Sequence, residues 1–127
     1  MNGTLLVGIG GFLGAIARYK LGAAVLQGTG IVRFPIGTFA VNVVGCFAIG
    51  LLAGVVARHQ VLGADARLFL FTGVLGGFTT FSAFGLESVE LLRRGDLATA
   101  SLYAGGSVVA GLAAVWLGLR LVELLPH

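Results

Sequence analysis

Charged residues divide the chain into four long runs that contain none. A helix needs about 20 mainly apolar residues to cross a bilayer. Three runs are long enough as they stand, and the first becomes so if it continues past Arg18 and Lys20. The connections between them are short, which predicts an all-α membrane protein whose single four-span domain covers residues 1–127. The predicted helices lie at about 4–26, 36–58, 67–92 and 97–121.

The composition supports a membrane environment. Apolar residues make up 57% of the chain and charged residues only 10%, against about 25% charged residues in ordinary soluble domains. A soluble enzyme is therefore not expected. A nucleic-acid partner is not expected either, because no dense run of lysine and arginine is present. Cys46 is the only cysteine, and inside an apolar run it is typical of a small hydrophobic residue.

The distribution of positive charge gives only a weak signal for orientation. Four spans place both termini on one side, and the side richer in lysine and arginine faces the cytoplasm. One side carries Arg58, Arg67 and Arg120; the other carries Arg18, Lys20, Arg33, Arg93 and Arg94. This difference fits either a single orientation with a modest bias or a chain that inserts both ways and pairs antiparallel.

Glycines occur at a spacing that favours close contact between helices. Residues four apart lie on one helix face, and small residues at this spacing let backbones approach in lipid. The pairs are Gly10 with Gly14, Gly50 with Gly54, and Gly73 with Gly77.

Polar residues within the spans mark candidate sites, because an unsatisfied polar group in hydrocarbon costs several kcal/mol. Thr38 and Asn42 share one face of the second helix, and Gly45 follows one turn later. Asn42 can bond to a neighbouring helix, or its amide can donate to an anion. The sequence leaves both interpretations open.

The third helix contains a segment that forms a poor helix. Two glycines precede two β-branched threonines within residues 76–82, which predicts a break within the membrane. Hydroxyl groups can repair such a break. Alternatively, the freed carbonyl oxygens can bind a cation, as in transporters with broken helices.

Three residues that follow the predicted break lie on nearly the same face of the third helix. Phe81 and Phe84 are three apart, and Glu87 lies three further on. The rings can pack as apolar groups, or their positive edges can face a small anion. Glu87 must lie near water, pair with a cation or be protonated, because an ionised carboxylate would repel an anion.

The fourth and first helices add further polar groups. Tyr103 and Ser107 are four apart and form a short ladder of hydroxyls, which suits either helix contact or an ion path. Arg18 can extend to the interface or provide positive potential at an anion entrance.

These segments together resemble the Fluc/CrcB family of small fluoride channels. Residues 10–19 resemble the family's first-helix motif, residues 37–47 its second and residues 73–84 its third, which is the most specific. The resemblance covers the whole chain in order. It implies a dual-topology, antiparallel homodimer with two fluoride pores, each lined by both subunits, in the plasma (inner) membrane.

The resemblance also implies roles for individual residues. Asn42 would donate to fluoride, while Phe81 and Phe84 would form an aromatic box whose edges face the ion. Gly76 and Thr79 would offer backbone carbonyls to one structural sodium ion at the dimer centre.

The remaining polar residues would form or support a polar track. Tyr103 and Ser107 would belong to it, with Thr38 and Ser82 as supporting hydroxyls. Two positions depart from the family pattern: Ala83 stands where threonine is common, and Gly111 stands one turn after Ser107, where another hydroxyl is often found.

The expected function is passive export of fluoride, which lowers its cytoplasmic concentration. A pore must replace the hydration shell of a small anion with donors, yet bind weakly enough to release it. The alternative is a small dual-topology, proton-coupled multidrug exporter, but that function needs a titratable group within a span. The first span has no Asp or Glu, and no nucleophile, base and acid suggest an enzyme.

Overall fold

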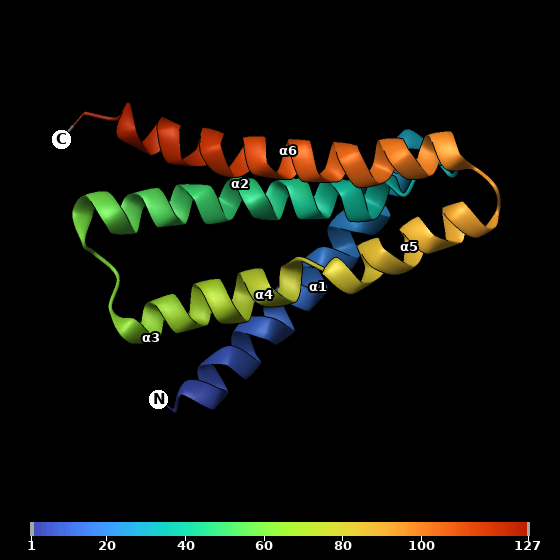
Figure 1. The fold of residues 1–127 in the computed structure, drawn as a ribbon. Helices are drawn as coiled ribbons and strands as arrows, with labels where there is room; N and C mark the ends of the chain where they lie inside the picture. Colours follow the sequence, from blue (N-terminus) through green and yellow to red (C-terminus); the bar gives the residue numbers. More distant parts are fainter. Residues whose placement is uncertain (1, 127) are drawn as a thin grey trace.

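Helices form nearly the whole chain in the computed structural model, which describes residues 2–126 (Figure 1). Four helical spans are long and apolar enough to cross a membrane, and each begins or ends a few residues beyond its predicted range. The first, second and fourth spans are single helices: α1 (Gly3–Thr29), α2 (Ile36–His59) and α6 (Leu97–Glu123).

The third span is composite. It consists of α3 (Ala64–Arg67), the π-helix η1 (Leu68–Leu75), α4 (Gly76–Phe78) and α5 (Phe81–Arg93). Thr79 and Thr80 separate α4 from α5 and belong to neither helix. The predicted break in the third helix is therefore confirmed.

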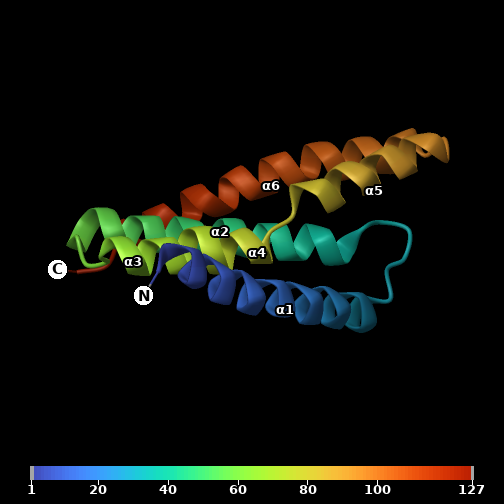
Figure 2. The same ribbon diagram turned by 90° about the horizontal axis from the view of Figure 1, so that it is seen from below.

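The four spans pack as two layers. Helices α2 and α6 run parallel side by side, and α1 lies against η1 and α4 (Figures 1 and 2). The described ends of the chain lie together with the α2–α3 connection, and the other two connections lie at the opposite end (Figure 1). This placement agrees with four spans that cross the membrane in alternating directions.

The predicted glycine spacing brings helix backbones into close contact in both layers. A Cβ added at Gly77 would lie 2.6 Å from the carbonyl oxygen of Gly11, between α4 and α1. A Cβ added at Gly118 would lie 2.6 Å from the carbonyl oxygen of Phe47, between α6 and α2. Larger side chains at these positions would force the helices apart, so glycine sets the helix spacing.

One cluster of buried residues lies at the end of the bundle where α5 meets α6. Tyr103 is fully buried and packs with Leu91 and Ala100, and the rings of Phe34, Phe39 and Phe84 pack around this cluster.

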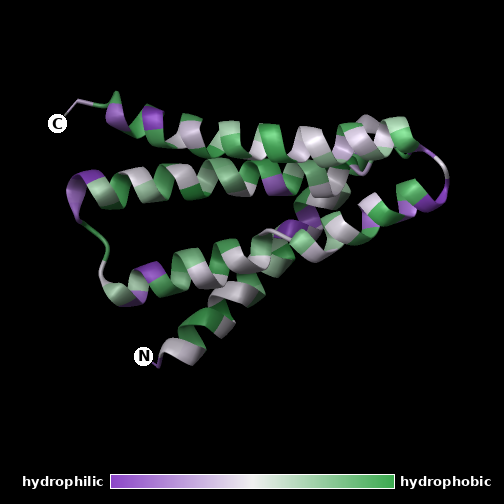
Figure 3. Cartoon of the chain, viewed as in Figure 1, coloured by the Kyte–Doolittle hydropathy of each residue, from purple (hydrophilic) through white to green (hydrophobic). Residues whose placement is uncertain are grey.

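Most other large apolar side chains point outward. Phe12, Leu112 and Trp116 are each more than 60% exposed, and hydrophobic residues cover the outer faces of the spans, whereas hydrophilic residues concentrate towards the helix ends (Figure 3). Such a surface requires lipid or another apolar partner, because water would not solvate it favourably.

Candidate functional site

The interruption of the third span organises the polar residues. Thr79 and Thr80 adopt extended backbone conformations, with φ/ψ of −90°/156° and −148°/110°. The first half still ends in a hydrogen-bonded turn, since the N–H of Thr79 donates to the Leu75 carbonyl at 3.0 Å and the Thr79 hydroxyl donates to the same oxygen at 2.9 Å.

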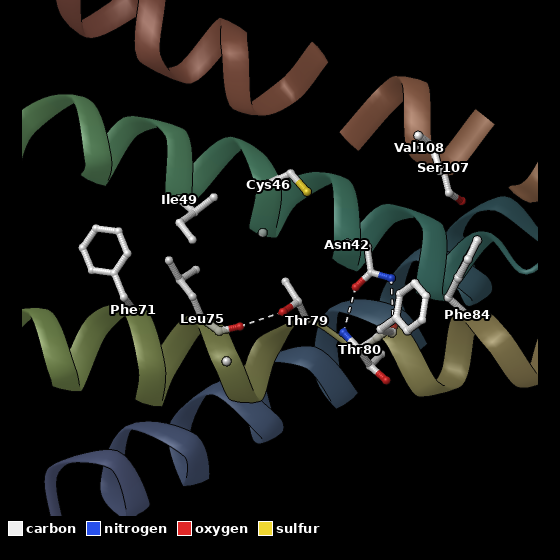
Figure 4. A pocket seen from close by; sticks show the side chains of 13 residues that line it. Asn42, Cys46, Ile49, Phe71, Leu75, Thr79, Thr80, Phe84, Ser107 and Val108 are labelled. Carbon is white, nitrogen blue, oxygen red and sulfur yellow. Dashed lines mark hydrogen bonds between the residues drawn. The ribbon is translucent and has the colours of Figure 1, made fainter. Parts of the chain in front are cut away.

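Asn42 of α2 pairs with the backbone of the break. Its Nδ2 donates to the Thr80 carbonyl at 3.1 Å, and the Thr80 N–H donates to its Oδ1 at 2.9 Å (Figure 4). Asn42 therefore bonds to the neighbouring third span, at residues between its helices. The amide retains a second N–H that this pair does not use.

The pairing at the break redirects two helical N–H groups. In a continuous helix, the N–H of Thr80 would bond to the Gly76 carbonyl and the N–H of Ala83 to the Thr79 carbonyl. Here the Thr80 N–H bonds to Asn42, and the Ala83 N–H bonds to the Thr80 hydroxyl at 3.1 Å. The carbonyl oxygens of Gly76 and Thr79 consequently lack their usual helical partners.

Arg18 of α1 approaches the break from another side. Its Nε donates to the Gly77 carbonyl at 3.1 Å. The guanidinium thus lies at the C-terminal end of α4, where a helix presents partial negative charge. Arg18 therefore turns towards the backbone of the third span.

A cavity of about 430 Å³, which we call the break cavity, lies beside the interruption. Residues of α2, α6 and both halves of the third span line it (Figure 4). It brings together six of the predicted site residues, which are Asn42, Gly76, Thr79, Phe81, Phe84 and Ser107.

Two aromatic rings stand at one side of the break cavity. The ring centroids of Phe81 and Phe84 lie 5.6 Å apart, with their planes tilted by 40°. Phe81 is 83% exposed in the single chain. Phe84 also packs on Tyr103, with centroids 5.2 Å apart, so it connects the cavity to the buried core.

Ser107 contributes an unsatisfied hydroxyl to the break cavity. Its Oγ is fully buried and has no hydrogen-bond partner within residues 2–126. A buried hydroxyl without a partner costs about 1–3 kcal/mol. Ser107 therefore leaves a hydroxyl without a partner in the wall of the break cavity.

A second polar group, the Glu87 cluster, consists of Glu87, Thr38 and Tyr103. The Thr38 hydroxyl donates to Oε1 of Glu87 at 2.8 Å, and the Tyr103 hydroxyl donates to Oε2 at 2.9 Å. Hydroxyl donors from α2 and α6 thus hold the carboxyl group, and no cation pairs with it in the described chain.

The structure separates residues that the sequence grouped together. Tyr103 and Ser107 do not form a direct ladder, because Tyr103 bonds to Glu87 while Ser107 faces the break cavity. Thr38 and Asn42 likewise bond to different partners. Ser82 does not line the cavity, and its Oγ lies 3.4 Å from the Thr80 hydroxyl.

Sequence reasoning assigned no role to Thr80 or to Cys46 in the site. Thr80 both pairs with Asn42 and caps α5, and a threonine three residues before a helical N–H is a recognised capping pattern. Cys46 lines the break cavity one turn after Asn42, a position that helical spacing from Asn42 indicates.

The CrcB family, described as "CrcB-like protein, Camphor Resistance (CrcB)", matches residues 5–119. Relatives named fluoride-specific ion channel FluC align over nearly the full length. The protein of Methylobacillus flagellatus is 47% identical, over 98% of this chain and 97% of its own. The protein of Novosphingobium aromaticivorans is 51% identical, over 97% of this chain and 98% of its own. The protein of Rhizobium etli is 46% identical, over 96% of this chain and 97% of its own.

The family match and the fold both indicate a membrane channel protein. The relatives' shared name describes an ion channel rather than an enzyme, and four apolar spans make this chain a multi-pass membrane protein. The family match covers all four spans, including the broken third one. The chain belongs to the CrcB family, whose members include these fluoride-specific ion channels.

Proposed function

We propose that this protein is a passive, fluoride-selective channel that exports fluoride and so lowers its cytoplasmic concentration. The names of its relatives support the choice of ion. The observation that carries the proposal is the buried, unpartnered hydroxyl of Ser107 in the same cavity as Asn42 and the Phe81 and Phe84 rings.

The break cavity offers the donors that a small anion needs. Fluoride gives up a strong hydration shell on entering a low-dielectric space, so the pathway must supply replacements. The Ser107 O–H, the second N–H of Asn42 and the positive edges of the two phenylalanine rings are such donors. They belong to α2, α5 and α6, which meet at the cavity.

The wall of the break cavity would bind fluoride without a fixed positive charge. No lysine or arginine lines it among residues 2–126, and the guanidinium of Arg18 is engaged with Gly77. Conduction requires binding that is weak enough for release. Neutral donors meet this requirement better than a buried cation, which would hold fluoride tightly.

We further propose that two chains pair antiparallel in the plasma (inner) membrane and form two pores. The weak charge asymmetry permits insertion in both orientations. The 83% exposure of Phe81 supports a pore completed by a second copy, because a pore-lining ring must be enclosed. Completing the pore would also cover part of the apolar outer surface.

A structural sodium ion would bind to the Gly76 and Thr79 carbonyls at the centre of this dimer. No group of three or more His, Cys, Asp or Glu side chains that could hold a metal occurs within the described residues. Sodium can instead be coordinated by backbone carbonyl oxygens. A sodium ion that binds only the assembled pair would stabilise it. Dimer dissociation in detergent should therefore increase when sodium is replaced by a bulky organic cation, and equal dissociation in both media would contradict this part of the proposal.

The test is efflux of fluoride and chloride from vesicles that contain the full chain. We expect rapid fluoride efflux with little chloride efflux, and we expect Phe81→Ile and Asn42→Ala to slow fluoride while the dimer persists on size-exclusion chromatography. Phe12→Ile is the matched control, because Phe12 is 66% exposed and lies outside the break cavity. Equal chloride efflux would refute selectivity, and proton-dependent drug transport would instead support the multidrug exporter.

A further inference from the structure

Cys46 lies at the break cavity beside residues that the proposed function uses. It follows Asn42 by one helical turn on α2, and both line the cavity. Figure 4 shows the Cys46 side chain on α2 among the residues that line the cavity. The thiol is only partly buried in the single chain.

Gly111 of α6 makes room for this sulfur. A Cβ added at Gly111 would lie 3.3 Å from the Sγ of Cys46, a distance at which one of the two groups would have to move. Gly111 follows Ser107 by one turn on the same face of α6. The thiol therefore occupies the space next to the position where a further side chain of the α6 track would stand.

The surroundings distinguish Cys46 from a cysteine packed in an apolar core. Ser107, on the facing helix, has its hydroxyl oxygen completely buried and without a partner in the described chain, and it lines the same cavity. An unpartnered hydroxyl in the wall of a cavity marks a polar part of that wall, because nearly all buried polar groups have a partner. Cys46 contributes to the wall of that space.

We propose that the Cys46 thiol forms part of the wall of the ion path, and that covalent modification by a small thiol-specific electrophile closes the path. This rests on the proposed channel function. The thiol is a weak donor, so it can contact a passing anion without holding it. A group added to the sulfur would take up space in the break cavity, because Cys46 lines it.

Methyl methanethiosulfonate is a suitable probe because it is small and uncharged. The thiol first loses its proton to the buffer, and the thiolate then attacks the sulfenyl sulfur of the reagent. A disulfide bond forms to a methylthio group, the bond between the two reagent sulfurs breaks, and methanesulfinate leaves. A reducing agent reverses the modification by thiol–disulfide exchange.

The experiment compares fluoride efflux from vesicles before and after treatment, with intact-mass spectrometry to measure modification. We expect efflux to fall by about tenfold, the change that a barrier raised by about 1.4 kcal/mol produces. Reduction should restore the flux. Because Cys46 is the only cysteine in the sequence, a mass increase identifies the modified site.

Two variants provide controls, each compared with its own untreated flux. Cys46→Ser should be insensitive to the reagent. Val44→Cys in the Cys46→Ser background places a thiol on the same helix, at a residue that is 46% exposed and outside the break cavity. It should be modified with no change in flux.

Different failures lead to different conclusions. Full modification of Cys46 with unchanged flux would overturn this proposal alone, and so would a thiol that the reagent does not modify in the folded channel. A fall in flux that also occurs in Cys46→Ser would overturn it as well. Absence of fluoride efflux before treatment would refute the proposed function on which it rests.

Discussion

The two halves of the third span differ in both partners and chemistry. The first half, from Ala64 to Phe78, lies against α1, where Gly77 meets the backbone of Gly11. The second half, α5, leaves α1 and packs on α6, where Leu91 joins the buried Tyr103. The change of partner occurs at the two extended residues between α4 and α5 (Figures 1 and 2).

This difference shows how an apolar bundle creates a polar cavity. The first half contacts α1 through backbone at its glycines, where an added Cβ at Gly73 or Gly77 would meet the α1 backbone. The second half turns away from that layer, and the break cavity lies where the two directions diverge. Asn42 and Arg18 satisfy backbone groups that the divergence leaves unpaired, as the low dielectric of a bilayer requires.

The largest expected effect is in the first half. Gly77→Ala places a Cβ 2.6 Å from the Gly11 carbonyl oxygen, so α1 and α4 must separate. We expect a loss of about 3 kcal/mol in the free energy of unfolding, the upper part of the usual range for overpacking. Unfolding by sodium dodecyl sulfate in mixed micelles measures it.

Gly85→Ala is the matched substitution in the second half. No atom outside its own helix lies within 4 Å of the added Cβ. Because alanine favours a helix over glycine by about 1 kcal/mol, this variant should be at least as stable as the wild type. Similar losses in both variants would show that the halves do not differ in packing.

The next effect concerns the break itself. Asn42→Ala removes both partners of the Thr80 backbone, and a buried group without a partner costs about 1–3 kcal/mol. We expect about 2 kcal/mol of destabilisation, with faster hydrogen exchange at the amide of Thr80. An unchanged exchange rate would mean that another group holds the break.

A smaller effect is expected where α5 packs on α6. Tyr103→Phe keeps the ring that contacts Phe84 but removes one of the two hydroxyls that donate to Glu87. Loss of one hydrogen bond should cost about 1 kcal/mol, measured by the same unfolding assay. Glu87→Gln in the Tyr103→Phe background tests the cause. Tyr103→Phe should lower the free energy of unfolding by less in the Glu87→Gln background than in the wild type. An equal decrease would show that the bond to Glu87 does not contribute to stability.

Much of the architecture follows from the sequence. Four charge-free runs, the first extended past Arg18 and Lys20, predicted the four spans, since the bilayer thickness fixes the length of a spanning helix. The weak helix formers between Gly76 and Ser82 predicted the break, because local propensity and hydroxyl content act over a few residues. Glycine spacing likewise predicted close backbone contacts.

The pairing of polar groups did not follow from the sequence. Tyr103 and Ser107 share a helix face, yet their surroundings differ. Tyr103 donates a hydrogen bond to Glu87 of α5, whereas Ser107 lines the break cavity. The hydrogen-bond partner of each side chain depends on which helices pack together, and these helices are distant in sequence. Helical periodicity identifies the face on which a residue lies but not which helix covers it.

The smallest effect should appear at the turn that joins α5 to α6. The Oδ1 of Asp96 accepts the N–H of Thr99 at 3.2 Å and caps α6. Hydrogen bonding from Thr99 lowers the pKa of Asp96 below its usual value, and Arg33 adds a weaker attraction from 3.9 Å. Because the pKa is lower in the folded protein, this stabilisation is present above the unfolded pKa of about 4 and is lost as pH falls through the folded value.

Asp96→Asn provides the test because asparagine also caps a helix but does not titrate in this range. Thermal unfolding in detergent should show the wild type losing stability relative to Asp96→Asn as the pH falls below about 4. Arg33→Ala should keep most of that pH dependence, since Thr99 is the larger cause. If the curves of wild type and Asp96→Asn stay parallel, the cap does not depend on the charge. If Arg33→Ala removes the dependence, the ion pair and not the cap is responsible.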